Sequence, residues 1–171
     1  MGQNSVLDNF CHQEVKMSKV LFVCLGNICR SPAAEGVMKH LLAEQGVDGL
    51  HVDSAGTSAY HEGERADSRM IEHAYKRGID LTSISRGLRP SDLDEFDYII
   101  AMDRSNLSGI RSLAKEHHHE KIFLMSAFCT KYDNEEVPDP YYGGAEGFEF
   151  VLDMVTDGCL GLIAHIKNER D

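Results

Sequence analysis

The chain alternates short apolar runs with longer amphipathic stretches. Four apolar runs have the length of buried strands, at residues 20–23, 50–55, 97–102 and 121–124. Five stretches have helical spacing or helix boundary residues, at 33–44, 68–77, 92–96, 105–116 and 145–167. A chain in which strands and helices alternate in this way folds as a parallel sheet with helices packed on both faces.

This order of elements predicts an α/β fold of three layers, a sandwich around a central four-stranded parallel sheet. Right-handed crossovers place the first strand in the centre, in the flavodoxin-like order 2-1-3-4. Ligands of such sheets bind at the carboxyl ends of the strands. We expect one domain over residues 18–171. The polar, unpatterned residues 1–17 are interpreted as a flexible extension or an upstream start.

Composition and charge are typical of one compact domain. The chain has 171 residues, of which 42% are hydrophobic, enough for a substantial core. No apolar run approaches the ~20 residues of a membrane span. A formal net charge of −11 argues against nucleic acid as a partner. Five cysteines, an odd number without a secretory signal, indicate a reducing compartment, so we expect a cytoplasmic protein.

The most informative stretch is the loop between the first strand and the first helix. Cys24 ends the strand, Arg30 closes the loop, and Ser31 and Pro32 open the helix. Backbone N–H groups of such a loop, together with the helix N-terminus, point at an anion. The arrangement therefore predicts a phosphate-binding loop.

The residue types of this loop suit nucleophilic attack on phosphorus. A helix N-terminus and a nearby arginine favour the thiolate form of Cys24, which is the nucleophile. The planar guanidinium of Arg30 matches two phosphate oxygens. Gly26 lets the backbone curl, Asn27 tolerates a left-handed conformation, and Ser31 is placed to donate to the sulfur. We interpret Cys24 as catalytic rather than as an ordinary buried cysteine.

A second candidate group lies far downstream. Asp139 stands between Pro138 and Pro140, whose fixed φ angles hold its carboxyl group in place. A positioned carboxylic acid that protonates a leaving oxygen contributes roughly 10²–10⁴-fold to a rate. Because turns also favour Pro and Asp, the acid role of Asp139 depends on its pairing with the cysteine loop.

These stretches resemble the low molecular weight protein tyrosine phosphatases over residues 18–168. The resemblance implies that phosphotyrosine, in proteins or as small aryl phosphates, is hydrolysed through a cysteinyl-phosphate, with no metal and no cofactor. Cys24 would be the nucleophile, Arg30 the phosphate clamp and Asp139 the acid and then the base. Inorganic phosphate would be product and inhibitor. The phosphate-binding loop would comprise Leu25, Gly26, Asn27, Ile28, Cys29 and Arg30.

The resemblance also implies supporting and pocket residues. Ser54 would hold Asn27 from the second strand, and Ser31 and Arg86 would support the loop. Three aromatic side chains would line the substrate pocket: Tyr60, Tyr141 and Tyr142.

One position departs from the family pattern. Many members carry a histidine, bonded to the loop asparagine, where this chain has Ser83. A serine reaches less far than a histidine but is still able to bond to Asn27. The arginine expected three residues later is present as Arg86, so the interpretation stands.

Cys29 is a candidate redox partner. It lies five positions after Cys24 in a loop that curls around one anion, so the two sulfurs are expected to approach each other. A disulfide between them would trap oxidised Cys24 and protect it from irreversible oxidation. The resemblance supports this hypothesis, and the alternative is a small residue that packs under the loop.

Three other functions stay open. A thioredoxin-coupled arsenate reductase shares the fold but needs a relay cysteine pair, and no cysteine lies between Cys29 and Cys129. A protein-arginine phosphatase has threonine where this chain has Ile28. A non-catalytic phosphate-binding module would not need an acid such as Asp139.

The remaining polar and sulfur-containing side chains favour structural roles. The three histidines at 117–119 point in different directions, so we expect a solvated loop rather than a metal site. Asp92 and Asp103 are expected to make buried hydrogen bonds. Cys129 and Cys159 have apolar neighbours and are expected in the core.

Overall fold

Four parallel strands form the centre of the molecule. They are β1 (Ser18–Cys24), β2 (Leu50–Gly56), β3 (Tyr98–Ala101) and β4 (Ile122–Leu124). The computed structural model describes residues 16–132, 136–141 and 143–171. β1 pairs with β2 on one side and with β3 on the other, which confirms the predicted order β2-β1-β3-β4. Residues 1–15 of the expected N-terminal extension lie outside the described residues.

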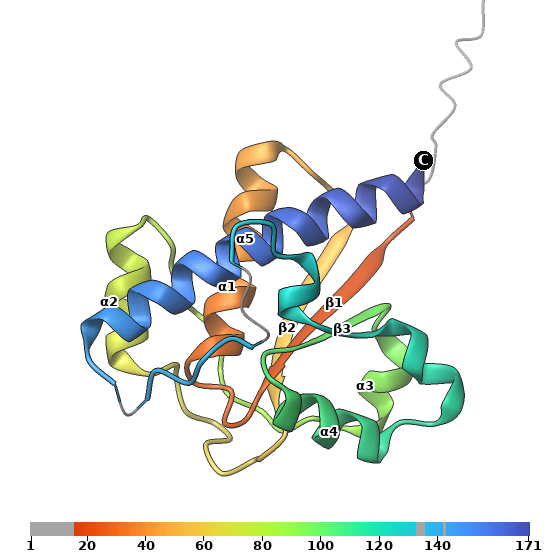
Figure 1. Ribbon diagram of the computed structural model, residues 1–171, viewed down its shortest axis with the longest axis horizontal. Coiled ribbons are helices and arrows are strands. Elements are labelled where there is room, and N and C mark those ends of the chain that lie inside the picture. The colour runs from red at the N-terminus through yellow and green to blue at the C-terminus, as the bar shows by residue number, and fades with distance from the viewer. Residues whose placement is uncertain (1–15, 133–135, 142) are drawn as a thin grey trace, which may run out of the picture.

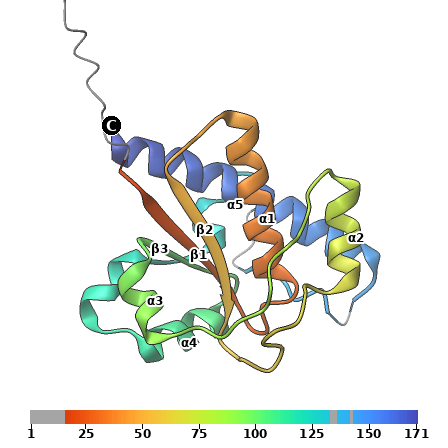
Figure 2. The same cartoon turned by 180° about the vertical axis from the view of Figure 1, so that it is seen from behind.

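Helices cover both faces of this sheet. The α-helices are α1 (Arg30–Gln45), α2 (Ser68–Lys76), α3 (Pro90–Glu95), α4 (Arg104–Leu113) and α5 (Ala145–Arg170), and the 3-10 helices are η1 (Glu116–Lys121) and η2 (Met125–Phe128). Figures 1 and 2 show α1 and α5 on one side of the sheet and α3 and α4 on the other. The predicted three-layer sandwich is confirmed.

The central strand divides the core into two clusters. Val20 and Phe22 belong to the larger cluster under α1 and α5, whereas Leu21 and Val23 belong to the cluster under α3 and α4. All four side chains are fully buried. Because alternate residues of a strand face opposite sides, a strand covered on both faces is apolar over its covered length, as β1 is from Val20 to Cys24.

Helix boundaries differ from the sequence prediction by a few residues. α3 begins at Pro90 rather than at residue 92, because the Asp92 carboxylate accepts a hydrogen bond from the backbone N–H of Arg89 (2.8 Å) and caps the helix. α1 begins at Arg30, directly after the loop, rather than at residue 33. These shifts place Arg30 on a rigid element.

The expected solvated loop at residues 117–119 is wrong for His118. The segment forms η1, and the His118 side chain is only 4% exposed. Its Nδ1 accepts a hydrogen bond from the backbone N–H of Lys115 (2.9 Å), and its Nε2 lies 2.7 Å from the Asp94 carboxylate. His118 therefore fastens η1 to α3.

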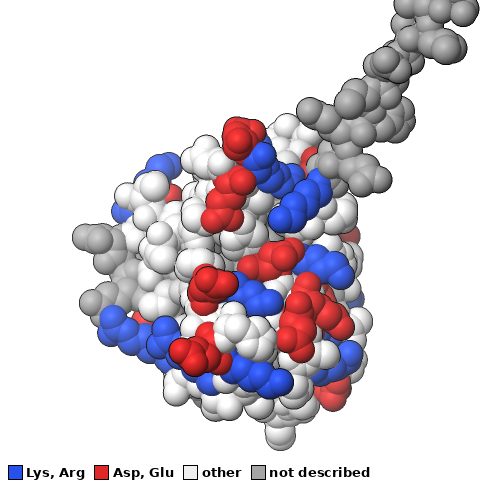
Figure 3. Space-filling model, turned by 90° about the vertical axis from the view of Figure 1, so that its right-hand side faces the viewer, with Lys and Arg blue, Asp and Glu red and all other residues white. Residues whose placement is uncertain are grey.

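Charged side chains of both signs are mixed on the surface. Figure 3 shows Lys and Arg interspersed with Asp and Glu over the face at the right-hand side of Figure 1. That face therefore offers no broad patch of one sign for a polyanion. None of the helices within the described ranges is long and apolar enough to cross a membrane.

Gly161 lets α5 pack against the backbone of η2. An ideal Cβ at Gly161 would lie 1.9 Å from the carbonyl oxygen of Phe128. A backbone atom cannot move aside as the end of a flexible side chain does. We therefore expect Gly161→Ala to lower the free energy of unfolding by about 2–3 kcal/mol, measured by urea denaturation.

Gly147→Ala, in the same helix, is the matched control. Its Cβ would lie 3.5 Å from the Cβ of Pro140, an ordinary contact. Alanine is also the better helix former by about 1 kcal/mol. The control should equal or exceed wild type in stability, and an equal loss in both variants would contradict the close approach at Gly161.

Candidate active site

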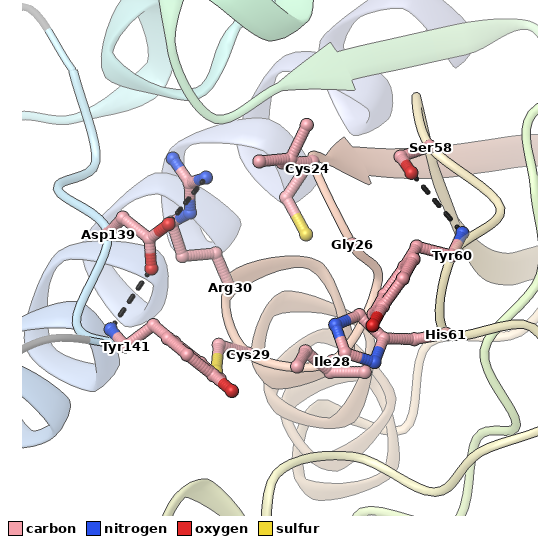
Figure 4. A pocket seen from close by; sticks show the side chains of 11 residues that line it. Cys24, Gly26, Ile28, Cys29, Arg30, Ser58, Tyr60, His61, Asp139 and Tyr141 are labelled. Carbon is pink, nitrogen blue, oxygen red and sulfur yellow. Dashed lines mark hydrogen bonds and ion pairs between the residues drawn. The ribbon is translucent and has the colours of Figure 1, made fainter.

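The loop predicted to bind phosphate turns at the carboxyl end of the central strand. Cys24 is the last residue of β1, and Arg30 is the first residue of α1. Both residues are buried, and only 3% of the surface of Arg30 is exposed. The Cys24 Sγ lies 3.0 Å from the Ser31 Oγ, where a hydroxyl donor stabilises a thiolate. Figure 4 shows that Cys24, Arg30 and Asp139 surround one pocket.

Asn27 holds the loop in shape from its inner side. Its backbone φ of 54° lies in the left-handed region, which asparagine tolerates. Its side-chain amide donates to the hydroxyls of Ser31 (2.8 Å) and Ser54 (2.9 Å). Its Oδ1 accepts from the backbone N–H of Arg86 (3.0 Å). These three bonds tie the loop to α1, to β2 and to the segment that follows α2.

Ser85, rather than Ser83, joins that segment to the loop. The Ser85 hydroxyl donates to the carbonyl of Gly26 (3.0 Å). Within the described residues, the hydrogen bonds of the Asn27 side chain go to Ser31, Ser54 and the backbone of Arg86, and none goes to Ser83. The backbone N–H of Arg86 provides the bond to Asn27 instead.

The turn after β2 supports the loop from the other side. The backbone N–H groups of Thr57 and Ser58 donate to the carbonyls of Cys24 and Leu25 (2.9 Å each). An ideal Cβ at Gly56 would lie 2.7 Å from the carbonyl oxygens of Leu25 and Ser58. Only glycine therefore allows the two backbones to run this close together.

Arg86 is fixed between two carboxylates. Its guanidinium lies 2.9 Å from Asp92 and 3.0 Å from Asp53. Burial opposes the charged form, but hydrogen bonds and charge from Asp92 and Asp53 outweigh it and raise the pKa of Arg86. Asp92 is buried, as expected, and the ion pairs hold the backbone N–H that Asn27 uses.

Arg30 has a fixed partner on one side and the pocket on the other. Its NH1 lies 2.5 Å from the Asp103 carboxylate and donates to the carbonyl of Val137 (3.2 Å), whereas its NH2 lies 3.7 Å from Asp139. Burial opposes the charge, but the negative charges of Cys24, Asp103 and Asp139 outweigh it and raise the pKa of Arg30. Sequence reasoning had treated Asp103 as structural only. The structure makes it the counter-ion of Arg30.

The loop that carries Asp139 is anchored beside β3. The backbone N–H of Val137 donates to the carbonyl of Met102 (2.8 Å). One Asp139 oxygen accepts from the backbone N–H of Tyr141 (3.0 Å), and the other is the one that lies near Arg30. The Asp139 side chain is 41% exposed, so it reaches both the pocket and solvent.

These groups line a cavity of about 420 Å³. Its lining residues are Cys24, Leu25, Gly26, Ile28, Cys29, Arg30, Ser58, Tyr60, His61, Asp139 and Tyr141. Tyr60 and His61 lie on one side of the mouth and Tyr141 on the other (Figure 4). The predicted pocket residue Tyr142 lies outside the described residues.

His61 is a pocket residue that sequence reasoning missed. Its Nδ1 lies 2.7 Å from the Glu64 carboxylate, and its ring meets the Tyr60 ring edge-on at 4.9 Å between centroids. An ideal Cβ at Gly26 would lie 3.0 Å from the His61 ring. The only sequence signal was its position directly after Tyr60.

The thiol of Cys29 has a strongly raised pKa. Burial, followed by the negative charges of Asp67, Cys24 and Asp139, raises its pKa to about 12. Cys29 is therefore a neutral thiol at physiological pH.

One cluster of possible metal ligands occurs among the described residues, at Asp94, His117 and His118. The His118 Nδ1 accepts a backbone hydrogen bond, so a neutral ring carries its proton on Nε2, the atom beside Asp94. A metal at Nε2 would have to displace that proton and break the backbone bond. The residues present do not fit a metal at this position.

Comparison with known proteins identifies close relatives of this arrangement. The family model for low molecular weight phosphotyrosine protein phosphatases matches residues 19–171. Low molecular weight phosphotyrosine protein phosphatase 1 of Drosophila melanogaster is 43% identical over 142 residues, which are 82% of this chain and 92% of that protein.

Solved structures of two phosphatases superpose on this chain. A protein tyrosine phosphatase from Entamoeba histolytica, crystallised with Hepes in its active site, superposes with a TM-score of 0.87 at 48% identity and covers 90% of this chain and 99% of its own. A Drosophila arginine phosphatase superposes with a TM-score of 0.82 at 33% identity, covering 87% and 98%.

The two loop thiols should differ in reactivity. At pH 7 Cys29 is protonated, because its pKa is about 12, whereas Cys24 faces Arg30 and the N-terminus of α1. We expect iodoacetate to alkylate Cys24 at least roughly tenfold faster than Cys29. Peptide mass spectrometry measures the extent of alkylation at each cysteine. Added inorganic phosphate should slow the alkylation of Cys24. Similar rates at both thiols would contradict the environment described for them.

Proposed function

This chain belongs to the low molecular weight phosphotyrosine protein phosphatase family, and on that premise we propose which of its residues carry out phosphotyrosine hydrolysis. The enzyme hydrolyses phosphotyrosine and small aryl phosphates through a cysteinyl-phosphate intermediate. The observation that carries the assignment is that Cys24, Arg30 and Asp139 meet in one cavity.

The first step transfers the phosphoryl group to the enzyme. The Cys24 thiolate forms a bond to phosphorus as the bond to the tyrosyl oxygen breaks. Arg30 and the N–H groups of the loop stabilise the equatorial oxygens. Asp139 gives its proton to the leaving oxygen, so tyrosine leaves as the neutral phenol.

The second step releases phosphate. Asp139, now ionised, takes a proton from a water molecule that attacks the phosphorus of the Cys24 thiophosphate. The bond from phosphorus to Cys24 breaks, and the hydrogen bond from Ser31 stabilises the departing thiolate. Inorganic phosphate is the product, and it should inhibit by occupying the same loop.

The pocket walls support aromatic substrates. Tyr60 and Tyr141 stand on opposite sides of the mouth, and Ile28 and Leu25 add apolar surface at the loop. Such walls suit a flat aryl ring.

The alternatives are weaker for specific reasons. Arsenate reduction needs a relay cysteine pair, yet the sequence has no cysteine between Cys29 and Cys129. A pure binding module would not need Asp139 beside Arg30. Arginine phosphatase activity is disfavoured by Ile28 in place of threonine, although the Drosophila arginine phosphatase shares the fold. Phosphoarginine is therefore the competing substrate to test.

Removal of the nucleophile tests the covalent route. We expect wild type to hydrolyse para-nitrophenyl phosphate in EDTA, and Cys24→Ser to lose turnover while it still binds inorganic phosphate in calorimetry. Substantial hydrolysis by Cys24→Ser would rule out a cysteinyl-phosphate. Phosphoarginine hydrolysis faster than phosphotyrosine hydrolysis would instead favour the arginine phosphatase.

Removal of the acid tests the role of Asp139. Asp139→Asn keeps the shape of the side chain and its acceptor for the Tyr141 N–H but cannot supply the proton. We expect kcat for phosphotyrosine to fall by roughly 10²-fold or more. A kcat within a factor of two of wild type would assign the proton to another group.

We further propose that Cys29 protects Cys24 from overoxidation. Peroxide converts the Cys24 thiolate to a sulfenic acid, and attack by the Cys29 sulfur then forms the disulfide and releases water. Both cysteines are buried and line the same cavity, which supports this pairing. After peroxide treatment and thiol reduction, Cys29→Ser should recover much less activity than wild type. Equal recovery would contradict the protective role.

A further inference from the structure

We propose that Arg69 is a positioning residue that fixes Tyr141 as one wall of the aryl pocket, and thereby sets the selectivity for aryl phosphates over inorganic phosphate. The inference rests on the proposed function. Arg69 is an exposed residue of α2 that lies outside the cavity lining but contacts Tyr141, one of the cavity walls.

The guanidinium of Arg69 lies over two aromatic rings. Its Cζ is 5.4 Å from the centroid of the Tyr141 ring and 4.8 Å from that of Phe148. Phe148 is buried at the start of α5 and belongs to the core rather than to the cavity lining. Arg69 therefore links a wall at the surface to a ring of the core.

Two hydrogen bonds to Asp67 hold the guanidinium in this orientation. Its Nε lies 3.1 Å and its NH2 2.9 Å from the two Asp67 oxygens, a bidentate pair that defines a plane. The backbone N–H of Asp67 donates to the carbonyl of Ile28 in the phosphate-binding loop (2.8 Å). Tyr141 is thus connected to the loop through Arg69 and Asp67.

Contacts between α2 and α5 keep the other end of this connection rigid. His73, one helical turn after Arg69, stacks on Phe148 with ring centroids 5.5 Å apart. Its Nδ1 lies 2.6 Å from Glu149, which also pairs with Arg77. The position of Phe148 under Arg69 is therefore determined by the packing of two helices.

Arg69 affects the width of the aryl pocket rather than the reacting groups. Tyr141 faces Tyr60 and His61 across the mouth (Figure 4), so a shift of Tyr141 changes the slot for the aryl ring. The hydrogen bonds and ion pairs of the phosphate site come from β1, α1 and Asp103, whereas Arg69 acts on this site only through its charge, which reaches Cys29. Loss of Arg69 should therefore weaken aryl binding more than it weakens phosphate binding.

The test compares Arg69→Gln with Arg77→Gln. Arg77 also joins α2 to α5, through Glu149 and Asp153, but its ion pairs do not reach the pocket rings. Calorimetry measures binding of phenylphosphonate, a non-hydrolysable aryl ligand, and of inorganic phosphate. We expect Arg69→Gln to weaken phenylphosphonate binding by roughly three- to tenfold more than it weakens phosphate binding, because the lost charge acts on both anions and the lost wall on the aryl ligand alone. Arg77→Gln should change neither affinity, because Phe148 stays buried and stacked on His73 without it.

A double-mutant cycle tests whether the effect passes through Tyr141. In a Tyr141→Leu background, Arg69→Gln should have no further effect on phenylphosphonate affinity. Asp67→Asn provides a second variant, because asparagine still caps α2 but loses the ionic bidentate pair, and it should show the same selective loss. Additive effects of Arg69→Gln and Tyr141→Leu, or an equal loss of phosphate affinity, would overturn the proposal.

Because the Arg69 experiment measures binding and not turnover, it can contradict the positioning role of Arg69 independently of the proposed phosphatase function. Absence of wild-type turnover would contradict the proposed function but leave the affinity comparison as a test of Arg69. Normal turnover with unchanged phenylphosphonate affinity in Arg69→Gln would contradict the positioning role alone.

Discussion

The burial of Arg30 is the constraint on which the site depends. A guanidinium this far from water is stable only with a carboxylate beside it, and Asp103 supplies one. Asp103 is placed by the fold, because it follows β3 and caps α4 by accepting from the backbone N–H of Asn106 (2.7 Å). β3 lies next to β1 in the sheet. The strand order therefore decides whether the phosphate clamp has its counter-ion.

The same pairing resolves an apparent conflict of charge. The chain carries a net charge of −11, yet its pocket must attract a dianion. Asp103 takes one side of the Arg30 guanidinium, and NH2 remains directed toward Asp139 and the pocket. The loop N–H groups and the N-terminus of α1 add positive potential that is local to the anion. A focused field of this kind needs no basic surface, and the face in Figure 3 has no such patch.

The sequence was sufficient to predict the fold and the residues that meet in the pocket, but not the side chains that support them. The alternation of strands and helices with right-handed crossovers predicted the sheet order, and local spacing singled out Cys24 and Arg30, which line one cavity. By contrast, Asp103 as a counter-ion and Ser85 in place of Ser83 depend on contacts between segments far apart in the chain. Three consecutive histidines that point in different directions predict a solvated loop, whereas the buried position of His118 depends on Asp94 of α3. Side-chain partners of this kind follow from tertiary packing, which periodicity does not encode.

Chemistry and selectivity are carried by different parts of the molecule. In the proposed mechanism, the carboxyl end of β1 and the start of α1 hold the nucleophile and the phosphate, and Asp103 after β3 pairs with Arg30. The aryl walls come from the loop after β2 and from the segment before α5, and α2 braces the latter through Arg69. Because Tyr141 also donates to Asp139 through its backbone, the wall and the acid share one loop. In the proposed mechanism, a substrate whose ring occupies the aryl slot also lies beside the acid, whereas free phosphate needs neither the wall nor the acid.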